Sequence, residues 1–228
     1  MLATATKARS EKKKSKYPNM VVVVLGAPGA GKGTQSELLV KKLGAEYIAI
    51  GKIVRSAAAS GTIERDIKEA YRRGELVKDE FVRDKVLKIL LTIPKEKPVV
   101  FDGFPRAGNQ LALFNSILAE SGRKVTAVIF LEVTVETAIK RISGRRICSR
   151  CGQSAATEES VCSVCGGELV RREDDKPEVV ARRTDEYLDT IKEVLDFFLK
   201  QRKLIRVDGE RKVEEIKREI AKKLGLMK

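Results

Sequence analysis

Short apolar runs alternate with amphipathic segments along most of the chain. Five apolar runs are candidate strands, at residues 20–25, 47–50, 98–101, 125–133 and 204–207. The longest of them are rich in β-branched residues, which is typical of strands buried on both faces of a parallel sheet. Segments with a helical period lie at 35–43, 110–120, 135–142, 178–203 and 213–224. Strands that alternate with helices predict an α/β fold with a parallel sheet.

Two stretches interrupt this alternation and indicate insertions. Residues 52–92 are typical of several helices, with breaks at Ser60-Gly61 and Arg73-Gly74. Residues 143–177 are polar, show no helical period and contain all four cysteines. We therefore expect a core made of 19–142 and 178–228, an insert at 48–82 and a small subdomain at 143–177. Residues 1–18 are basic and polar, and are expected to be a disordered tail.

Charge and composition narrow the chemistry. The 228 residues carry a net charge of +14 and include no histidine. Histidine is the usual general base near neutral pH. Because the chain has none, any catalysis must depend on Lys, Arg, Asp and the backbone. A chain this basic predicts an anionic partner, which could be nucleic acid or a small polyphosphate.

Membrane and secretion signals are missing from the sequence. No stretch approaches the roughly 18 apolar residues that span a bilayer, and the N-terminus lacks the apolar segment of a signal peptide. We therefore expect a cytoplasmic protein without a membrane partner. In that compartment the four cysteines are better explained as metal ligands than as disulfides.

A glycine-rich loop at residues 26–34, called the phosphate loop below, matches the pattern G-x-x-x-x-G-K between an apolar strand and a helix. Glycines let backbone N–H groups surround phosphate oxygens, and the helix N-terminus favours the same anion. Lys32 is expected to reach the outer phosphates, while Gly33 replaces the usual Ser or Thr. A direct hydroxyl contact to Mg²⁺ is therefore not expected there. The predicted triphosphate contacts are Gly29, Ala30, Gly31, Lys32, Gly33 and Thr34.

A second landmark is the pentapeptide Asp-Gly-Phe-Pro-Arg at residues 102–106, which follows a predicted strand. Ligands of open parallel sheets bind at the carboxyl ends of strands. Asp102 can orient waters around Mg²⁺. Arg106 can bridge the phosphates of a donor and an acceptor with its forked guanidinium group.

The cysteines form two C-x-x-C pairs separated by ten residues, each followed by glycine. Two such turns can close a tetrahedral zinc site, and four protein ligands leave no open position, so the site is predicted to be structural. A disulfide or an iron site is the alternative. The predicted ligands are Cys148, Cys151, Cys162 and Cys165.

Together, the phosphate loop, the pentapeptide and the cysteine pairs resemble adenylate kinases and related nucleoside monophosphate kinases over residues 20–224. The cysteines are similar to the metal-bearing lid of the long form. This resemblance implies a three-layer P-loop core with a five-stranded parallel sheet. It also makes 48–82 a helical insert that binds the nucleoside monophosphate, and 143–177 a zinc-ribbon-like lid. The lid's spacer is shorter than the family pattern, so fewer contacts to ATP are expected.

The resemblance also implies binding residues. Contacts to AMP are carried over to Ile50, Arg55, Glu75, Leu76, Val77, Gly103, Phe104, Pro105, Arg106, Gln110, Arg172 and Arg183. Contacts to ATP extend to Arg141, Arg145 and the segment around Arg211. The implied catalytic set is Lys32, Asp102, Arg106, Arg145, Arg172 and Arg183.

At several positions the resemblance does not decide which residue matches the family or what its role is. The choice of arginine is ambiguous at the doublets 145/146, 171/172 and 182/183. Asp174 and Asp175 match an acidic pair of the lid, which could form hinge contacts or cap the next helix. The family's Thr and Asp are replaced by Ile50 and Lys52. Loss of the Thr hydroxyl predicts looser recognition of AMP.

The expected reaction is Mg²⁺-assisted transfer of a phosphoryl group from ATP to AMP, giving two ADP. One alternative is a nucleoside monophosphate kinase with a broad or non-ATP donor range. A second alternative is a zinc ribbon that binds nucleic acid. The low aromatic content disfavours it, because few side chains are available to stack on bases. A third is an assembly ATPase. The resemblance is compatible with a monomer or a small homo-oligomer, including a trimer.

Overall fold

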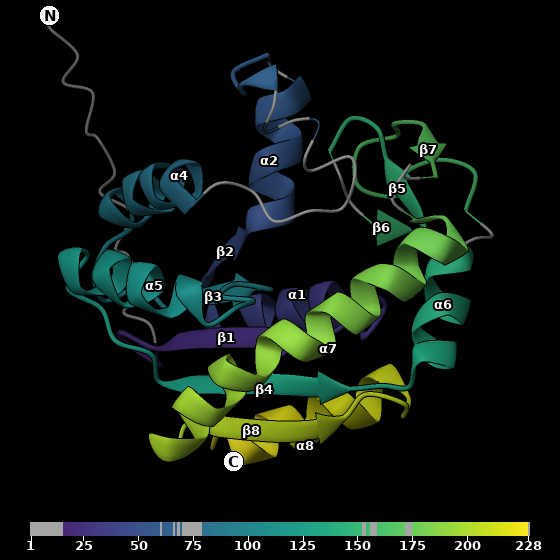
Figure 1. The fold of residues 1–228 in the computed structure, drawn as a ribbon. Coiled ribbons are helices and arrows are strands. Elements are labelled where there is room, and N and C mark those ends of the chain that lie inside the picture. Colours follow the sequence, from purple (N-terminus) through teal and green to yellow (C-terminus); the bar gives the residue numbers. More distant parts are fainter. Residues whose placement is uncertain are drawn as a thin grey trace, which may run out of the picture.

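The computed structural model describes residues 16–59, 61–65, 67, 69, 79–151, 154–155, 159–171 and 175–227. Figure 1 shows the order of the elements along the chain. The helices are α1 (Lys32–Leu43), α2 (Ile50–Ala59), α4 (Asp79–Thr92), α5 (Asn109–Glu120), α6 (Val135–Ser143), α7 (Pro177–Lys200) and α8 (Val213–Lys223). The main strands are β1 (Val21–Gly26), β2 (Glu46–Ala49), β3 (Val99–Asp102), β4 (Ala127–Glu132) and β8 (Leu204–Asp208).

The five predicted strands form one parallel sheet in the order β2-β3-β1-β4-β8. β1 lies in the middle, with Val22 paired to Val100 of β3 and to Ala127 of β4. Parallel strands end at the same edge of a sheet, so the phosphate loop after β1 and the pentapeptide after β3 are neighbours. This arrangement confirms the predicted α/β class and sheet.

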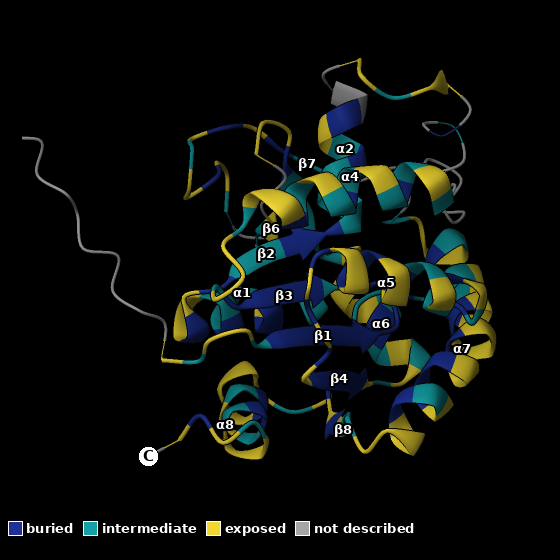
Figure 2. Cartoon of the chain, turned by 90° about the vertical axis from the view of Figure 1, so that its left-hand side faces the viewer, coloured by how far each residue is buried: buried dark blue, intermediate teal, exposed yellow. Residues whose placement is uncertain are grey.

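Helices cover both faces of the sheet, which explains why β1 is apolar throughout. Val21, Val23 and Leu25 pack into a core with residues of α4, α5 and α7. Val22 and Val24 point to the other face, where α1 and α8 supply the partners. Figure 2 shows the buried strands between helices whose outer surfaces are exposed. A strand with two covered faces gains by being apolar at every position.

A second, smaller sheet lies within residues 143–177. Its antiparallel strands β5 (Arg146–Cys148), β6 (Ser154–Ala155) and β7 (Leu169–Val170) follow the order β6-β5-β7. These strands are only two or three residues long. Such short polar strands leave too little alternation to be found from the sequence. In Figure 1 the small sheet lies beside α6 and the start of α7.

Helix boundaries differ from the predictions in small ways. α1 begins at Lys32 rather than at residue 35, and α7 ends at Lys200 rather than at 203. Ile50, predicted to end a strand, instead begins α2. The predicted helix break at Arg73-Gly74 lies outside the described residues. Among the described helices, none is both long and apolar enough to cross a membrane.

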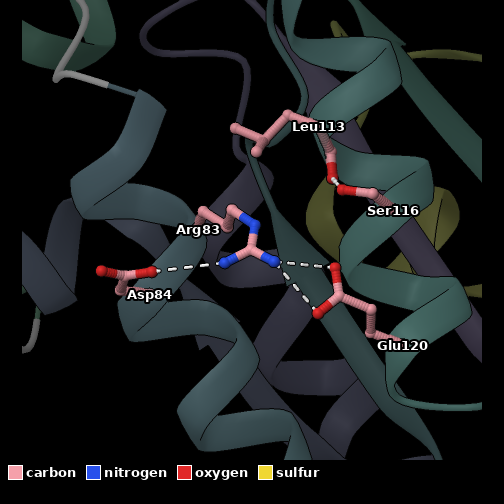
Figure 3. A network of polar contacts seen from close by, with 5 residues as sticks. All are labelled: Arg83, Asp84, Leu113, Ser116 and Glu120. Carbon is pink, nitrogen blue, oxygen red and sulfur yellow. Dashed lines mark hydrogen bonds and ion pairs between the residues drawn. The ribbon is translucent and has the colours of Figure 1, made fainter.

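Two arginines connect the region of α4 with the region of α5. One lies in α4 and contacts α5, and the other follows α5 and contacts the loop between α4 and β3. Arg83 of α4 donates to both carboxylate oxygens of Glu120 at 2.9 and 3.0 Å, and lies 3.5 Å from Asp84 (Figure 3). Arg123, after α5, is only 5% exposed. Its guanidinium donates to the carbonyl groups of Ile93, Pro94 and Lys97 at 2.7–3.1 Å, and thereby holds the loop between α4 and β3.

We expect Arg123→Met to lower the free energy of unfolding by about 2 kcal/mol, because the loop carbonyls lose their charged donor. Arg83→Met is the matched control. It removes a half-exposed ion pair and should cost less than about 1 kcal/mol. Urea denaturation of both variants measures the difference, and equal losses would contradict the structural role assigned to Arg123.

Candidate functional site

A cleft of about 980 Å³ opens at the carboxyl ends of the parallel strands. Its walls come from the phosphate loop, the start of α2, the end of β3, α6, α7 and the small sheet, which contributes Ser154 and Ala155. This edge of an open parallel sheet is where ligands of α/β proteins bind. The cleft therefore brings the core and both predicted insertions to one site.

The phosphate loop follows a path that requires glycine. Gly29 has a φ of +82°, and a Cβ there would lie 2.5 Å from the carbonyl oxygen of Ala138 in α6. The start of the loop is held by Tyr187 of α7, whose hydroxyl oxygen accepts a 2.8 Å hydrogen bond from the Gly26 N–H group. The sequence contains no motif that points to Tyr187, because this contact joins residues far apart in the chain.

Lys32 begins α1 and turns its ammonium group back to the loop. Its Nζ donates to the carbonyl oxygens of Gly26 and Ala27 at 2.7 and 2.8 Å. Burial lowers the pKa of Lys32 to about 7, an effect that the negative charge of Asp102 opposes. A polyphosphate beside Lys32 would raise this pKa again, because an anion favours the charged ammonium.

Three arginines add to the positive charge around Lys32. Arg106, Arg145 and Arg183 each lower the pKa of Lys32 through charge repulsion, and all three line the cleft. Arg106 lies in the loop after β3, Arg145 in the link between α6 and β5, and Arg183 in α7. Such a cluster of cations is suited to the negative charge of phosphoryl groups.

At the end of β3, Asp102 lies in the cleft wall and Arg106 is oriented by its own loop. Arg106 Nε donates to the Gly103 carbonyl oxygen at 2.7 Å. Asp102 Oδ2 accepts a 2.6 Å hydrogen bond from the hydroxyl of Tyr47 in β2. Carboxylate oxygens are ligands that Mg²⁺ prefers, directly or through water, so this position fits a metal bound with a nucleotide.

Predicted contacts to AMP fall into three groups. Arg55, Arg106 and Arg183 line the cleft. Gly103, Phe104, Pro105 and Gln110 are buried instead, and Ile50 packs against the core. Phe104 contacts Phe114 edge to face, with ring centroids 5.5 Å apart. Glu75, Leu76, Val77 and Arg172 lie outside the described residues.

Gln110 is engaged within the protein. Its Oε1 accepts from the Arg106 N–H group at 2.9 Å, and its Nε2 lies 3.4 Å from Asp79 Oδ1. Recognition of an AMP base by this amide would require these contacts to be exchanged. The assignment of Gln110 therefore stays a prediction.

On the ATP side, the structure separates two of the arginine doublets. Arg145 lines the cleft, whereas Arg146 belongs to β5. Arg183 lines the cleft, whereas Arg182 lies 3.7 Å from Glu186 on the surface of α7. In both doublets, the arginine that lines the cleft is the one that the resemblance implied.

Further predicted ATP contacts differ in exposure to the cleft. Gly29, Gly31, Gly33, Thr34 and Arg141 line it, whereas Ala30 is buried at 1% exposure. The side chain of Arg211 turns away to pair with Asp208 and Glu219. Sequence reasoning missed Thr137, Lys140 and Glu210, which also line the cleft.

Asp175 connects the small sheet to the cleft. Its carboxylate accepts from two nitrogens of Arg145, one of them at 3.0 Å, and the Asp175 side chain is only 6% exposed. The residue before α7 is Lys176, so Asp175 forms the ion pair rather than the helix cap that the sequence left open. Asp174 lies outside the described residues.

All four predicted sulfur ligands come together. The Sγ atoms of Cys148, Cys151, Cys162 and Cys165 lie within 4.8 Å of one another. Hydrogen bonds, the largest from the Cys151 backbone, lower the pKa of Cys148 to about 6, which favours a thiolate. A Cβ on Gly167 would lie 2.7 Å from Cys148 Sγ, so glycine is required at this turn. Four converging sulfurs could hold a tetrahedral metal ion.

Comparison with known proteins agrees with this geometry. A family model described as adenylate kinase matches residues 24–203. An adenylate kinase of Fervidobacterium nodosum is 35% identical over 213 residues, covering 90% of this chain and 98% of the relative. Adenylate kinases of Pyrococcus furiosus and Caldicellulosiruptor bescii are 34% and 37% identical, covering 86% and 91% of this chain and 92% and 100% of the relatives. The chain therefore belongs to the adenylate kinase family.

Proposed function

We propose that the protein catalyses the reversible transfer of the γ-phosphoryl group of ATP to AMP, giving two ADP. One observation carries this proposal: a single cleft holds the phosphate loop, Arg55 on the acceptor side, and Arg106, Arg145 and Arg183 around Lys32. Membership in the adenylate kinase family supports the choice of nucleotides.

The reaction needs positioning and charge stabilisation rather than a general base. A phosphate oxygen of AMP, already anionic, attacks the γ-phosphorus while the bond from that phosphorus to the β–γ bridging oxygen breaks. Lys32 and the phosphate loop hold the donor phosphates, and Arg55 holds the acceptor phosphate. Arg106 and Arg183 stabilise the charge on the group in transfer.

Mg²⁺ bound with ATP would be held from the protein side by Asp102, and it supplies neutralisation of the phosphate charge. We infer that segment 143–177 acts as a lid over this cleft, since Ser154 and Ala155 already form part of its wall. Closure would exclude water and so prevent hydrolysis of ATP. The ion pair of Arg145 with Asp175 supports a hinge at the base of the lid.

In the lid, we propose that the four cysteines bind one structural Zn²⁺ ion. The four sulfurs would fill all four tetrahedral positions, so the metal would have no open site for chemistry. Its role would be to join the two turns that carry the short strands β5, β6 and β7.

Purified protein incubated with Mg²⁺ and ADP should form AMP and ATP in equal amounts. Lys32→Met should reduce this rate by about a hundredfold or more, because the ammonium stabilises the transferring charge. Lys42→Met is the matched control, since Lys42 lies at the exposed end of the same helix and should keep the wild-type rate. Failure of the wild-type protein to convert ADP would refute the proposed function.

Binding of ATP should take up close to one proton at pH 8. The pKa of Lys32 is about 7 without ligand, so the amine is mostly neutral at pH 8, and the phosphates raise its pKa on binding. Affinity should therefore fall as pH rises above 7. Calorimetry in two buffers of different ionisation enthalpy measures the uptake. Lys32→Arg, which stays charged throughout, should abolish it; uptake of the same size in this variant would assign the proton to another group.

Metal analysis of the purified protein should give one zinc per chain. Cys162→Ser should lower the zinc content and the thermal stability of the protein, because three remaining thiolates bind the ion less tightly. Ser163→Ala, a neighbouring change outside the ligand set, is the control. A zinc content well below one per chain in the wild-type protein would refute the proposed zinc site in the lid.

A further inference from the structure

The hydroxyl group of Tyr47 lies beside residue 33 of the phosphate loop, where this chain has glycine instead of Ser or Thr. Gly33 follows the lysine of the loop, and a Cβ built on it would lie 3.9 Å from the hydroxyl oxygen of Tyr47. The same Cβ would lie 3.7 Å from Asp102 Oδ2. Tyr47 therefore reaches from β2 to the part of the cleft that a Ser or Thr at residue 33 would approach.

The contact of Tyr47 with Asp102 is short and charge-assisted. The phenol donates to Asp102 Oδ2 at 2.6 Å, a distance typical of an O–H bond to a carboxylate. One carboxylate oxygen is thus fixed, which also fixes the direction of the other.

Lys52 of the cleft wall lies over the ring of Tyr47 and is itself paired with Glu37. Lys52 Nζ lies 4.7 Å from the ring centroid, within the range of a cation–π contact. The same ammonium lies 3.2 Å from Glu37 Oε1 on α1, and both side chains are one-third exposed. Lys52 belongs to the first turn of α2, so the cluster joins α1, α2, β2 and the end of β3.

We propose that Tyr47 is a positioning residue for Asp102, which it orients toward the metal–nucleotide complex, and that Lys52 and Glu37 keep its ring in place. This inference rests on the proposed function, because it assigns Asp102 to the metal bound with ATP. It also assigns a role to Lys52, which supports the ring of Tyr47 and does not bind the metal.

Tyr47→Phe is the direct test, because it keeps the ring over Lys52 and removes only the hydroxyl. With Mn²⁺ as the probe and electron paramagnetic resonance to measure free Mn²⁺, the variant–ATP complex should bind the metal about five- to tenfold more weakly than wild type. The Mg²⁺ concentration for half-maximal ADP conversion should rise by a similar factor. Lys52→Met should shift both quantities in the same direction by about two- to threefold.

Tyr17→Phe is the matched control, since it removes a phenol outside the cleft lining and should leave both quantities at wild-type values. Circular dichroism and thermal melts establish that each variant is folded. Metal affinity and Mg²⁺ dependence of Tyr47→Phe within twofold of wild type would overturn the inference, as would a loss of rate with unchanged Mn²⁺ binding. Absence of ADP conversion by the wild type would instead refute the proposed function.

Discussion

The cleft is organised around a cluster of positive charge, formed by Lys32 with Arg106, Arg145 and Arg183. Lys32 is partly neutralised by burial and by the arginines around it, while Asp102 opposes this effect from the end of β3. Four cations around one cleft repel one another, and a bound anion relieves that repulsion. Phosphate groups supply that anion, so the charge arrangement accounts for binding of the ligand and for stabilisation of the group in transfer.

This arrangement depends on a rigid scaffold beneath it. β1 is covered on both faces, and its carboxyl end leads directly into the phosphate loop. The loop is fixed by contact of Gly29 with α6 and by the hydrogen bond from Gly26 to Tyr187. Because α6 and α7 also carry Arg141 and Arg183, the same elements that fix the loop place the arginines.

Two departures from the family pattern lie together on one side of the cleft. Ile50 and Lys52 begin α2 directly after β2, where Tyr47 contacts Asp102. Ile50 packs into the core and offers no hydroxyl to a ligand. The position of Lys52 over the Tyr47 ring shows how a cation can be accommodated where the family has a carboxylate. Both departures therefore lie in the first turn of one helix.

The sequence alone determined the features that depend on local pattern. The apolar runs indicated all five strands of the main sheet, most clearly the inner strands β1, β3 and β4, where burial on both faces demands continuous apolar residues. Spacing indicated the phosphate loop and the cluster of four cysteines, because a tight turn fixes neighbours within a few residues. Tertiary structure alone decided which arginine of the 145/146 and 182/183 doublets enters the cleft. It also revealed Tyr47 and Tyr187, whose hydroxyls act on residues 55 and 161 positions away in the chain. Such contacts follow from how the helices and strands pack, and local sequence carries no record of that packing.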